Sequence, residues 1–354
     1  MMWSYHERPS AASVQETESE KAADDQPMDH ADPENTANPR VQNAAATLRA
    51  GRLVAFPTET VYGLGAIATD DRAVARIFEA KARPRFNPLI VHIVDQAAGK
   101  AIADWSDLAE RLAEQFWPGP LALILKKRAD STISKLVSAG GDTIALRAPA
   151  HPLARALLRA TDLPVAAPSA NRSGRISPTT ADHVRQSLAD RVDMVLDGDA
   201  CSVGVESTVL DITGERPRLL RPGGLARHDI ETVIGEALAP EKGVQGDHST
   251  LRSPGQLESH YAPGHRLRLD AEDVAADEAL LAFGPNPPEG ARVMANLSRD
   301  GDLAEAAANF FSMLHHLDSQ DVTGIAAMPI PAVGLGEAIR DRLKRAAVRP
   351  NQRV

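Results

Sequence analysis

Cationic side chains recur at the ends of predicted strands in this 354-residue chain. The stretch KARPRFNPLIVHI places Lys81, Arg83 and Arg85 directly ahead of an apolar run that is typical of a buried strand. Arg147 ends another strand-like run, and Arg221 ends a third. Each cation alone is more often a solvated surface residue. Guanidinium groups, however, bind carboxylate and phosphate through two parallel hydrogen bonds. Together these residues predict a site for an anionic ligand.

Hydroxyl, amide and imidazole groups accompany these cations at the predicted strand ends. Besides Asn87 and His92, the stretches PTETVYGLG, APSAN and GVEST supply Thr58, Thr60, Tyr62, Ser169, Asn171, Glu206, Ser207 and Thr208. In α/β sheets, ligands bind in the crevice that opens where strands end. The sequence therefore predicts that these polar groups converge with the cations on one site.

Strand-like and helix-like segments alternate along most of the chain, which predicts an α/β fold with a mixed sheet and flanking helices. Residues 1–40 are polar and acidic and are expected to be a disordered tail. A catalytic domain is expected at 41–238 and a smaller, Rossmann-like α/β domain at 265–350. Residues 239–264 are rich in Gly, Pro and Ser, so they are predicted to be a linker.

The charge distribution favours a local anionic ligand over a broad nucleic-acid surface. The net charge is −9, and only residues 41–226 carry a positive balance, with 23 basic and 20 acidic side chains. The single cysteine, Cys201, excludes a disulfide framework and fits a reducing, cytoplasmic setting. No apolar run reaches the roughly 20 residues of a transmembrane helix, so no membrane role is expected.

Several common functional motifs are weak or missing. GLGAIA at 63–68 spells a dinucleotide-binding pattern, but a polar stretch precedes it where that fold needs an apolar strand. There is no phosphate-binding loop of the G-x-x-x-x-G-K type, no zinc spacing and no serine-hydrolase elbow. His315 and His316 are adjacent on a predicted helix, so we expect one to be a surface residue and the other a core residue.

The order of the short motifs is similar to that of the YrdC-domain family. The motifs are PTETVYGLG, KARPRFNPLIVHI, FWPGPL, LRAPAHPLA, APSANRSGRISPT, GVESTVLD and LLRPGG. Two later stretches, SPGQLESHYAP and GLGEAIRDRLKRAA, resemble the long two-domain form, L-threonylcarbamoyladenylate synthase. The resemblance covers about residues 41 to 350 and implies a YrdC-like mixed twisted sheet.

The resemblance implies a nucleotidyltransferase. Such an enzyme joins L-threonine, bicarbonate or CO2, and ATP into threonylcarbamoyl-AMP and releases pyrophosphate. Mg²⁺ accompanies the ATP, and no protein-bound metal or organic cofactor is expected. A separate tRNA threonylcarbamoyl transferase complex then passes the group to an adenosine beside the anticodon, so direct tRNA binding is expected to be weak or absent.

The resemblance also implies roles for individual residues. Those expected to hold threonine, with Arg147 on its α-carboxylate, are Thr60, His92, Arg147 and Ser207. Those expected at ATP are Lys81, Arg83, Asn87, Thr143, Ala167, Ser169, Asn171, Ser177, Arg221 and Tyr261. The first three of these engage the phosphates, and Tyr261 closes over the site as part of a mobile lid. The chain departs from the family pattern at Ala82, where glycine is usual, and at QLES in the linker.

Two alternatives remain at this stage. The first is an RNA-binding YrdC-fold module without synthase activity, because the fold is also associated with a concave basic surface. The second is a carbamoyl transfer like that of related domains in hydrogenase maturation. Those domains are fused to acylphosphatase-like and zinc-finger modules, and this chain has no C-x-x-C pair.

Overall fold

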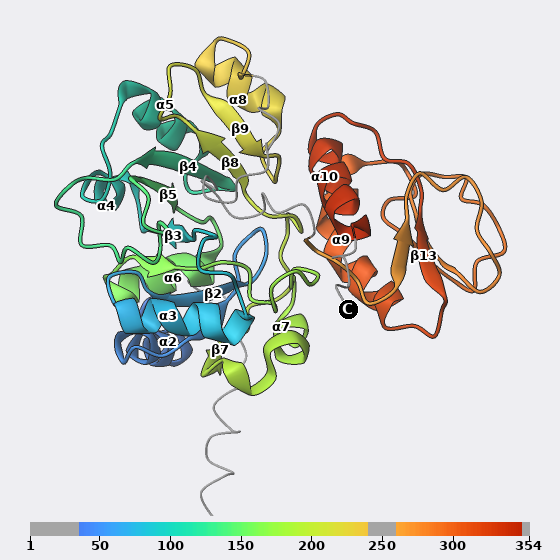
Figure 1. The fold of residues 1–354 in the computed structure, drawn as a ribbon, viewed down its shortest axis with the longest axis horizontal. Helices are drawn as coiled ribbons and strands as arrows, with labels where there is room; N and C mark the ends of the chain where they lie inside the picture. Colours follow the sequence, from blue (N-terminus) through green and yellow to red (C-terminus); the bar gives the residue numbers. More distant parts are fainter. Residues whose placement is uncertain (1–34, 240–259, 349–354) are drawn as a thin grey trace, which may run out of the picture.

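A computed structural model describes residues 35–239 and 260–348 (Figure 1). Most of the predicted acidic tail, 1–34, lies outside the described residues. The same holds for 240–259, which contain most of the predicted linker and lid. The described chain forms a larger α/β domain up to Ala239 and a smaller α/β domain whose first strand begins at Arg266.

The larger domain contains a mixed nine-stranded sheet in the order β7-β1-β2-β6-β3-β5-β4-β8-β9, which confirms the predicted fold class. Its strands are β1 (Val54–Phe56), β2 (Gly63–Ile67), β3 (Ile90–His92), β4 (Leu121–Lys126), β5 (Thr143–Arg147), β6 (Val165–Ala166), β7 (Met194–Val195), β8 (Thr208–Asp211) and β9 (Arg218–Arg221). β3 and β5 are parallel, and their register pairs His92 with Arg147. Two residues predicted to hold threonine therefore lie side by side at the ends of their strands.

Helices cover this sheet on both faces. They are α2 (Pro39–Arg49), α3 (Asp71–Lys81), α4 (Gln96–Lys100), α5 (Asp107–Phe116), α6 (Pro152–Thr161), α7 (Ala181–Leu188) and α8 (Arg227–Ile234), with a 3-10 turn at Ala189–Arg191. The Asp70 carboxylate accepts hydrogen bonds from the first amides of α3, as a helix cap does. α2 starts at Pro39, inside the stretch 1–40 that was expected to be a disordered tail, because Asn38 caps it and proline suits a first helical turn.

The alternation of side chains along the strands places apolar clusters on both faces of the sheet. Leu53 and Ala55 pack with α3, α5, α7 and α8 on one face, whereas Val54 and Phe56 pack with α2 and α6 on the other. Pro152 lies in the first turn of α6, and the preceding His151 caps that helix with its imidazole. Both faces are thereby removed from water, and the strand ends are left to carry the polar residues.

The smaller domain has a four-stranded sheet in the order β10-β13-β11-β12, with all pairs parallel. Its strands are β10 (Arg266–Arg268), β11 (Ala279–Ala282), β12 (Val293–Asn296) and β13 (Gly324–Ala327), and its helices are α9 (Leu303–Asp318) and α10 (Leu335–Ala347). The parallel sheet with its packed helices confirms the predicted second, small α/β domain.

Helices α9 and α10 face the larger domain (Figure 1). An apolar cluster spans the boundary, where Val61 and Val205 of the larger domain join Phe310 and Phe311 of α9. Polar contacts add to it, since Arg227 of α8 donates to Glu337 of α10 at 2.6 Å. The two domains therefore share a continuous packed interface rather than one tether.

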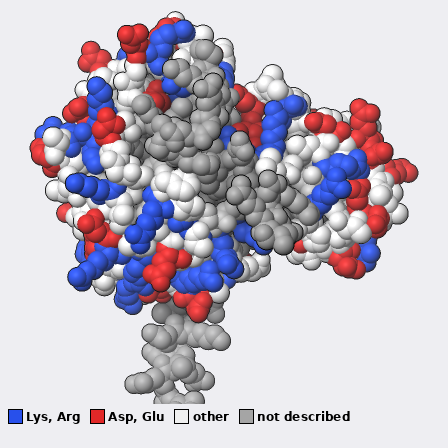
Figure 2. Space-filling view, in the orientation of Figure 1, with Lys and Arg blue, Asp and Glu red and all other residues white. Residues whose placement is uncertain are grey.

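Charged side chains of both signs are interspersed over the visible face of the larger domain (Figure 2). No single basic patch dominates the part of that face that the structure describes. Over residues 35–239 and 260–348, no helix combines the length and the apolar character needed to cross a bilayer.

Candidate active site

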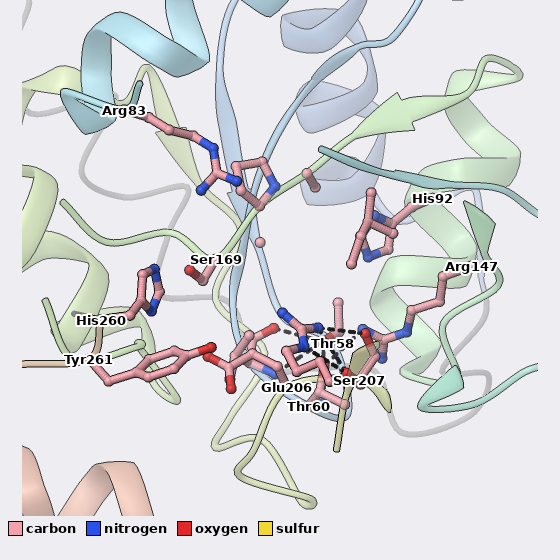
Figure 3. Close-up of a pocket in the computed structure, with 16 residues that line it drawn as sticks. Thr58, Thr60, Arg83, His92, Arg147, Ser169, Glu206, Ser207, His260 and Tyr261 are labelled. Atoms are coloured by element: carbon pink, nitrogen blue, oxygen red, sulfur yellow. Dashed lines mark hydrogen bonds between the residues drawn. The ribbon is translucent and has the colours of Figure 1, made fainter. Parts of the chain in front are cut away.

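A pocket lies at the strand ends of the larger domain, beside the segment that begins at His260 (Figure 3). It brings together most of the predicted site residues from seven separate motifs. The predicted residues that line it are Thr60, Arg83, His92, Arg147, Ala167, Ser169, Ser207, Arg221 and Tyr261. In Figure 3, His92 and Arg147 lie toward one end of the pocket, and His260 and Tyr261 lie toward the other. The predicted convergence of polar strand ends is therefore present.

Arg147 is fixed from several sides at the end of β5. Its Nη2 donates to Glu59 Oε1 at 2.6 Å, its Nη1 donates to Thr60 Oγ1 at 2.9 Å, and its Nε donates to the Gly119 carbonyl at 3.1 Å. The second oxygen of Glu59 accepts from the Ala150 amide at 3.0 Å. The guanidinium is thus oriented before any ligand arrives, and Glu59 engages one side of the fork that was expected to meet a carboxylate.

His92 is a neutral hydrogen-bonding group in this environment. Burial and the charge of Arg147 lower the pKa of His92 to about 3. Its ring stands edge-on to Phe56, with centroids 6.0 Å apart. Its Nδ1 is buried and has no hydrogen-bond partner among the described residues. Because an orphaned buried polar atom costs free energy, this nitrogen would gain from a hydrogen bond to a ligand in the pocket.

Arg83 and Arg221 supply two further buried cations. Arg83 donates from Nη2 to the Pro88 carbonyl at 2.9 Å, which holds its guanidinium toward the pocket (Figure 3). Burial and the charge of Arg221 lower the pKa of Arg83 to about 9, so it remains charged at neutral pH. Arg221 donates from Nη2 to the Ser207 carbonyl at 2.8 Å and to Ser207 Oγ at 3.1 Å. Two buried cations that line one pocket form a strong site for an anion.

Five predicted residues, Thr143 included, do not line the pocket directly. Two of them, Lys81 and Asn171, contact Ser169 of the pocket wall: Lys81 donates to the carbonyls of Ser169 and Asn171, and Asn171 Oδ1 accepts from Ser169 Oγ at 2.6 Å. Burial and Arg83 lower the pKa of Lys81. The amide of Asn87 is buried, and neither of its polar atoms has a partner among the described residues. Ser177 is the fourth, and its Oγ donates to Glu206.

Thr143 is the one predicted residue that stands apart. It begins β5, whereas Arg147 ends that strand, and its register partner Lys126 is exposed. A strand rises about 3.3 Å per residue, so the two ends of β5 are separated by roughly 13 Å. In this structure Thr143 does not reach the pocket, and its predicted contact with ATP stays a prediction.

Glu206 connects the pocket to the C-terminal domain. Its Oε1 accepts from Ser177 Oγ at 2.5 Å, and its Oε2 accepts from Arg342 Nε at 2.9 Å. Arg342 lies on α10 and is fully buried. Helix α10 therefore docks on the larger domain and contacts the pocket-wall residue Glu206 through Arg342.

Tyr261, near the C-terminal end of the predicted linker, lines the pocket. It is only 1% exposed, and its ring packs against Phe311 at 5.6 Å between centroids. Burial and Glu206 raise the pKa of Tyr261, so its hydroxyl is a donor at neutral pH. Neighbouring His260 donates its backbone amide to the Arg345 carbonyl at 3.2 Å. Tyr261 is thus in place at the pocket, whereas lid motion would involve residues outside the described ones.

Sequence reasoning did not single out Glu59 and Arg342. Glu59 lies within PTETVYGLG, and a carboxylate between two threonines in an otherwise buried motif is the signal that could have identified it. Arg342 lies on a helix whose charged residues are spaced like those of a surface helix, so its burial depends on the other domain. No local signal in the sequence identifies it.

The fold and the pocket define a two-domain α/β protein with three buried arginines in a pocket at its strand ends. The Sua5/YciO/YrdC family model, described as "Telomere recombination", matches residues 46–223, and the model of the threonylcarbamoyl-AMP synthase C-terminal domain matches residues 225–348. The chain belongs to the threonylcarbamoyl-AMP synthase family, in its long two-domain form.

Individual relatives agree with this assignment over nearly the whole chain. The threonylcarbamoyl-AMP synthase of Pyrococcus abyssi is 41% identical over 87% of this chain and 94% of its own. That of Bacillus subtilis is 41% identical over 90% and 96%. The crystal structure of P. abyssi Sua5 complexed with L-threonine matches with a TM-score of 0.79 at 39% identity, covering 87% of this chain and 94% of that one.

Proposed function

We propose that this chain is a threonylcarbamoyl-AMP synthase, a nucleotidyltransferase that uses L-threonine, bicarbonate or CO2, and ATP. The observation that carries this proposal is the pocket itself, where Arg83, Arg147 and Arg221 converge in a chain whose full-length relatives bear that name. The RNA-binding alternative is not favoured, because the relatives are named as synthases and the described part of the face drawn in Figure 2 carries charges of both signs interspersed. The same names do not favour the hydrogenase-type carbamoyl transfer.

The chemistry requires positioning more than a strong base. Threonine's neutral amine adds to CO2 and loses a proton, and its pKa of roughly 8 leaves a usable neutral fraction near pH 7. A carbamate oxygen then attacks the α-phosphorus of ATP. The new O–P bond forms as the bond to the β-phosphate oxygen breaks, and pyrophosphate leaves with that electron pair. In-line placement and neutralisation of the leaving charge are each worth several kcal/mol.

In our proposal the end of the pocket near β3 and β5 holds threonine. Arg147 presents the donors that Glu59 and Thr60 do not use to the α-carboxylate, because Glu59 holds the guanidinium in one orientation. His92 offers a neutral imidazole and Ser207 a hydroxyl. A neutral histidine suits this place, since its unprotonated ring nitrogen can accept a hydrogen bond from threonine.

The opposite end is proposed to hold ATP. Arg83 and Arg221 meet the phosphates, Tyr261 donates its hydroxyl, and Ala167 and Ser169 contact the nucleotide from the strand end. Lys81, Asn87, Asn171 and Ser177 support this wall from behind, and Thr143 is retained from the resemblance alone. Mg²⁺ is proposed to arrive with ATP, as part of the substrate. The described residues include no group of three or more His, Cys, Asp or Glu side chains placed to hold a metal.

We further propose that the product passes, in the cytoplasm, to a separate transferase complex that modifies tRNA. The chain's own contact with tRNA is expected to be weak, with a Kd that rises steeply between 50 and 200 mM salt. Tight tRNA binding that withstands this salt increase would contradict that part of the proposal.

The experiment that tests the function is release of pyrophosphate from ATP, with threonine and bicarbonate omitted in turn. We expect release to require both. Release that needs neither would show a plain ATP pyrophosphohydrolase. An enzyme that binds ATP but releases no pyrophosphate would revive the RNA-binding alternative.

A further inference from the structure

Arg342 is a charged residue of the C-terminal domain that lies entirely inside the protein. Its relative exposure is 0%, and it donates from Nε to Glu206 Oε2 at 2.9 Å across the domain boundary. Its Nη1 donates to the Pro222 carbonyl at 2.6 Å and to Asp341 Oδ2 at 2.9 Å. Its guanidinium carbon is 5.4 Å from the centroid of the Tyr261 ring. Arg342 therefore contacts two residues that line the pocket without lining it itself.

Glu206 is the partner that gives this contact a consequence for the reaction. It is a buried carboxylate on the wall of a pocket whose other ionised side chains are arginines. An uncompensated negative charge at this position would oppose the entry of a triphosphate. Glu206 also accepts from Ser177, a residue assigned to the nucleotide, so its position and its charge both matter for that end of the pocket.

We propose that Arg342 is a positioning residue for the nucleotide end of the pocket, acting through Glu206 and Tyr261. It neutralises the Glu206 carboxylate and packs behind the Tyr261 ring. The C-terminal domain thereby contributes a counter-charge to ATP binding as well as an apolar surface. This inference rests on the proposed function, because it assigns ATP to that end of the pocket.

The second cross-domain ion pair provides a matched control. Arg227 and Glu337 also join the larger domain to α10, at 2.6 Å, but their side chains are 38% and 31% exposed and do not line the pocket. Exposed pairs contribute little, whereas removal of one partner from a buried pair leaves an uncompensated charge. Loss of the Arg227 pair therefore disturbs docking without changing the charge on Glu206.

The test is a double-mutant cycle read as separate KM values for ATP and threonine in the pyrophosphate assay. Arg342→Met is expected to raise the KM for ATP at least tenfold and to leave the KM for threonine within threefold. In the Glu206→Gln background, the same substitution should change the KM for ATP less than threefold, because position 206 on the pocket wall then carries no charge for Arg342 to neutralise. The KM for ATP of Arg227→Met should stay within twofold of the wild-type value.

Two results would overturn the proposal. One is an equal effect of Arg342→Met in both backgrounds, which indicates a role that does not pass through Glu206. The other is an increase in the KM for ATP in Arg227→Met that equals the increase in Arg342→Met, which indicates that both residues act only through domain docking. If Arg342→Met does not fold, the double variant is compared with Glu206→Gln. KM values for ATP within threefold of each other then support the proposal, and a tenfold difference overturns it.

Failure of the proposed function gives a different result. In that case the wild-type protein itself releases no pyrophosphate with threonine and bicarbonate present. The same four variants are then titrated with ATP by calorimetry, and the same cycle in Kd decides whether Arg342 acts through Glu206. The two failures are therefore distinguishable.

Discussion

The carboxylate of Glu59 accepts a hydrogen bond from Arg147 Nη2 at 2.6 Å, and the two side chains are only 9% and 4% exposed. We expect Glu59→Ala to reduce stability by about 3–5 kcal/mol, because it leaves a buried guanidinium uncompensated. It should also raise the KM for threonine more than that for ATP. Glu59→Gln keeps a hydrogen-bond acceptor, so its stability and its KM for threonine should lie between those of the wild type and Glu59→Ala. Chemical denaturation and pyrophosphate kinetics measure both effects, and an unchanged threonine KM in Glu59→Ala would contradict the assignment.

Arg83 and Arg85 form a natural matched pair. They are two residues apart, yet Arg83 is buried at the pocket and Arg85 is exposed. Arg83→Ala is expected to raise the KM for ATP by at least tenfold, since a charge-assisted hydrogen bond to an anion is worth about 1.5–3 kcal/mol. Arg85→Ala should change it less than twofold. Similar KM values for the two variants would exclude Arg83 from the phosphate site.

His315 makes stability at the domain boundary depend on pH. Its ring stacks on His183, with centroids 4.0 Å apart, and burial followed by the charge of His183 lowers the pKa of His315 to about 4. The unfolded pKa is near 6.5, so below that pH the unfolded state binds more protons. The contribution of neutral His315 to the free energy of unfolding is complete above pH 6.5 and is lost as the pH falls toward 4.

Between pH 7 and pH 5 the wild type should lose about 1–2 kcal/mol through His315. Urea unfolding at the two pH values measures this loss. His315→Gln should remove that share of the pH dependence, whereas His316→Gln, which changes the exposed neighbour, should keep it. Equal pH dependence in wild type and His315→Gln would refute the effect.

Substitutions at Gly204 and Gly140 can distinguish the cost of a close contact from the cost of backbone strain. Both have positive φ, +74° and +82°. A Cβ at Gly204 would lie 2.3 Å from the Ala307 carbonyl oxygen of α9, whereas one at Gly140 would meet nothing within 4 Å. Gly140→Ala should cost about 1–2 kcal/mol for the left-handed backbone. Gly204→Ala should cost roughly 1–3 kcal/mol more, because α9 must move. Equal melting temperatures for Gly204→Ala and Gly140→Ala would show that the contact between Gly204 and α9 is not tight.

Ala82 offers a stabilising change at the departure from the family pattern. It ends α3 in the left-handed region, with φ 49° and ψ 45°, and it is exposed. Alanine pays about 1–2 kcal/mol for this conformation and glycine does not, although glycine loses more chain entropy on folding. Ala82→Gly should therefore stabilise the protein by up to about 1 kcal/mol. A lower melting temperature for this variant would contradict the prediction.

The starts of several helices carry local signals in the sequence. Asp70, Ser106 and Asp302 each cap the helix that follows, because their side chains accept hydrogen bonds from its first amides. The short helix α4 was not predicted, since a five-residue segment carries too little periodicity. His316 is exposed as expected of one of the pair, but His315 lies at the domain boundary rather than in a core.

The sequence by itself determined which chemical groups gather at the pocket, because each motif places its cation or hydroxyl at a strand end and strand ends converge in a sheet. Arg147 and His92 are the clearest case, since their strands pair in parallel register. Only the tertiary structure decided which charges neutralise one another. Glu59 meets Arg147 across 88 positions of the chain, and Glu206 meets Arg342 across 136. Such pairs form only when distant segments pack together and exclude water, and no local pattern of residues records that event.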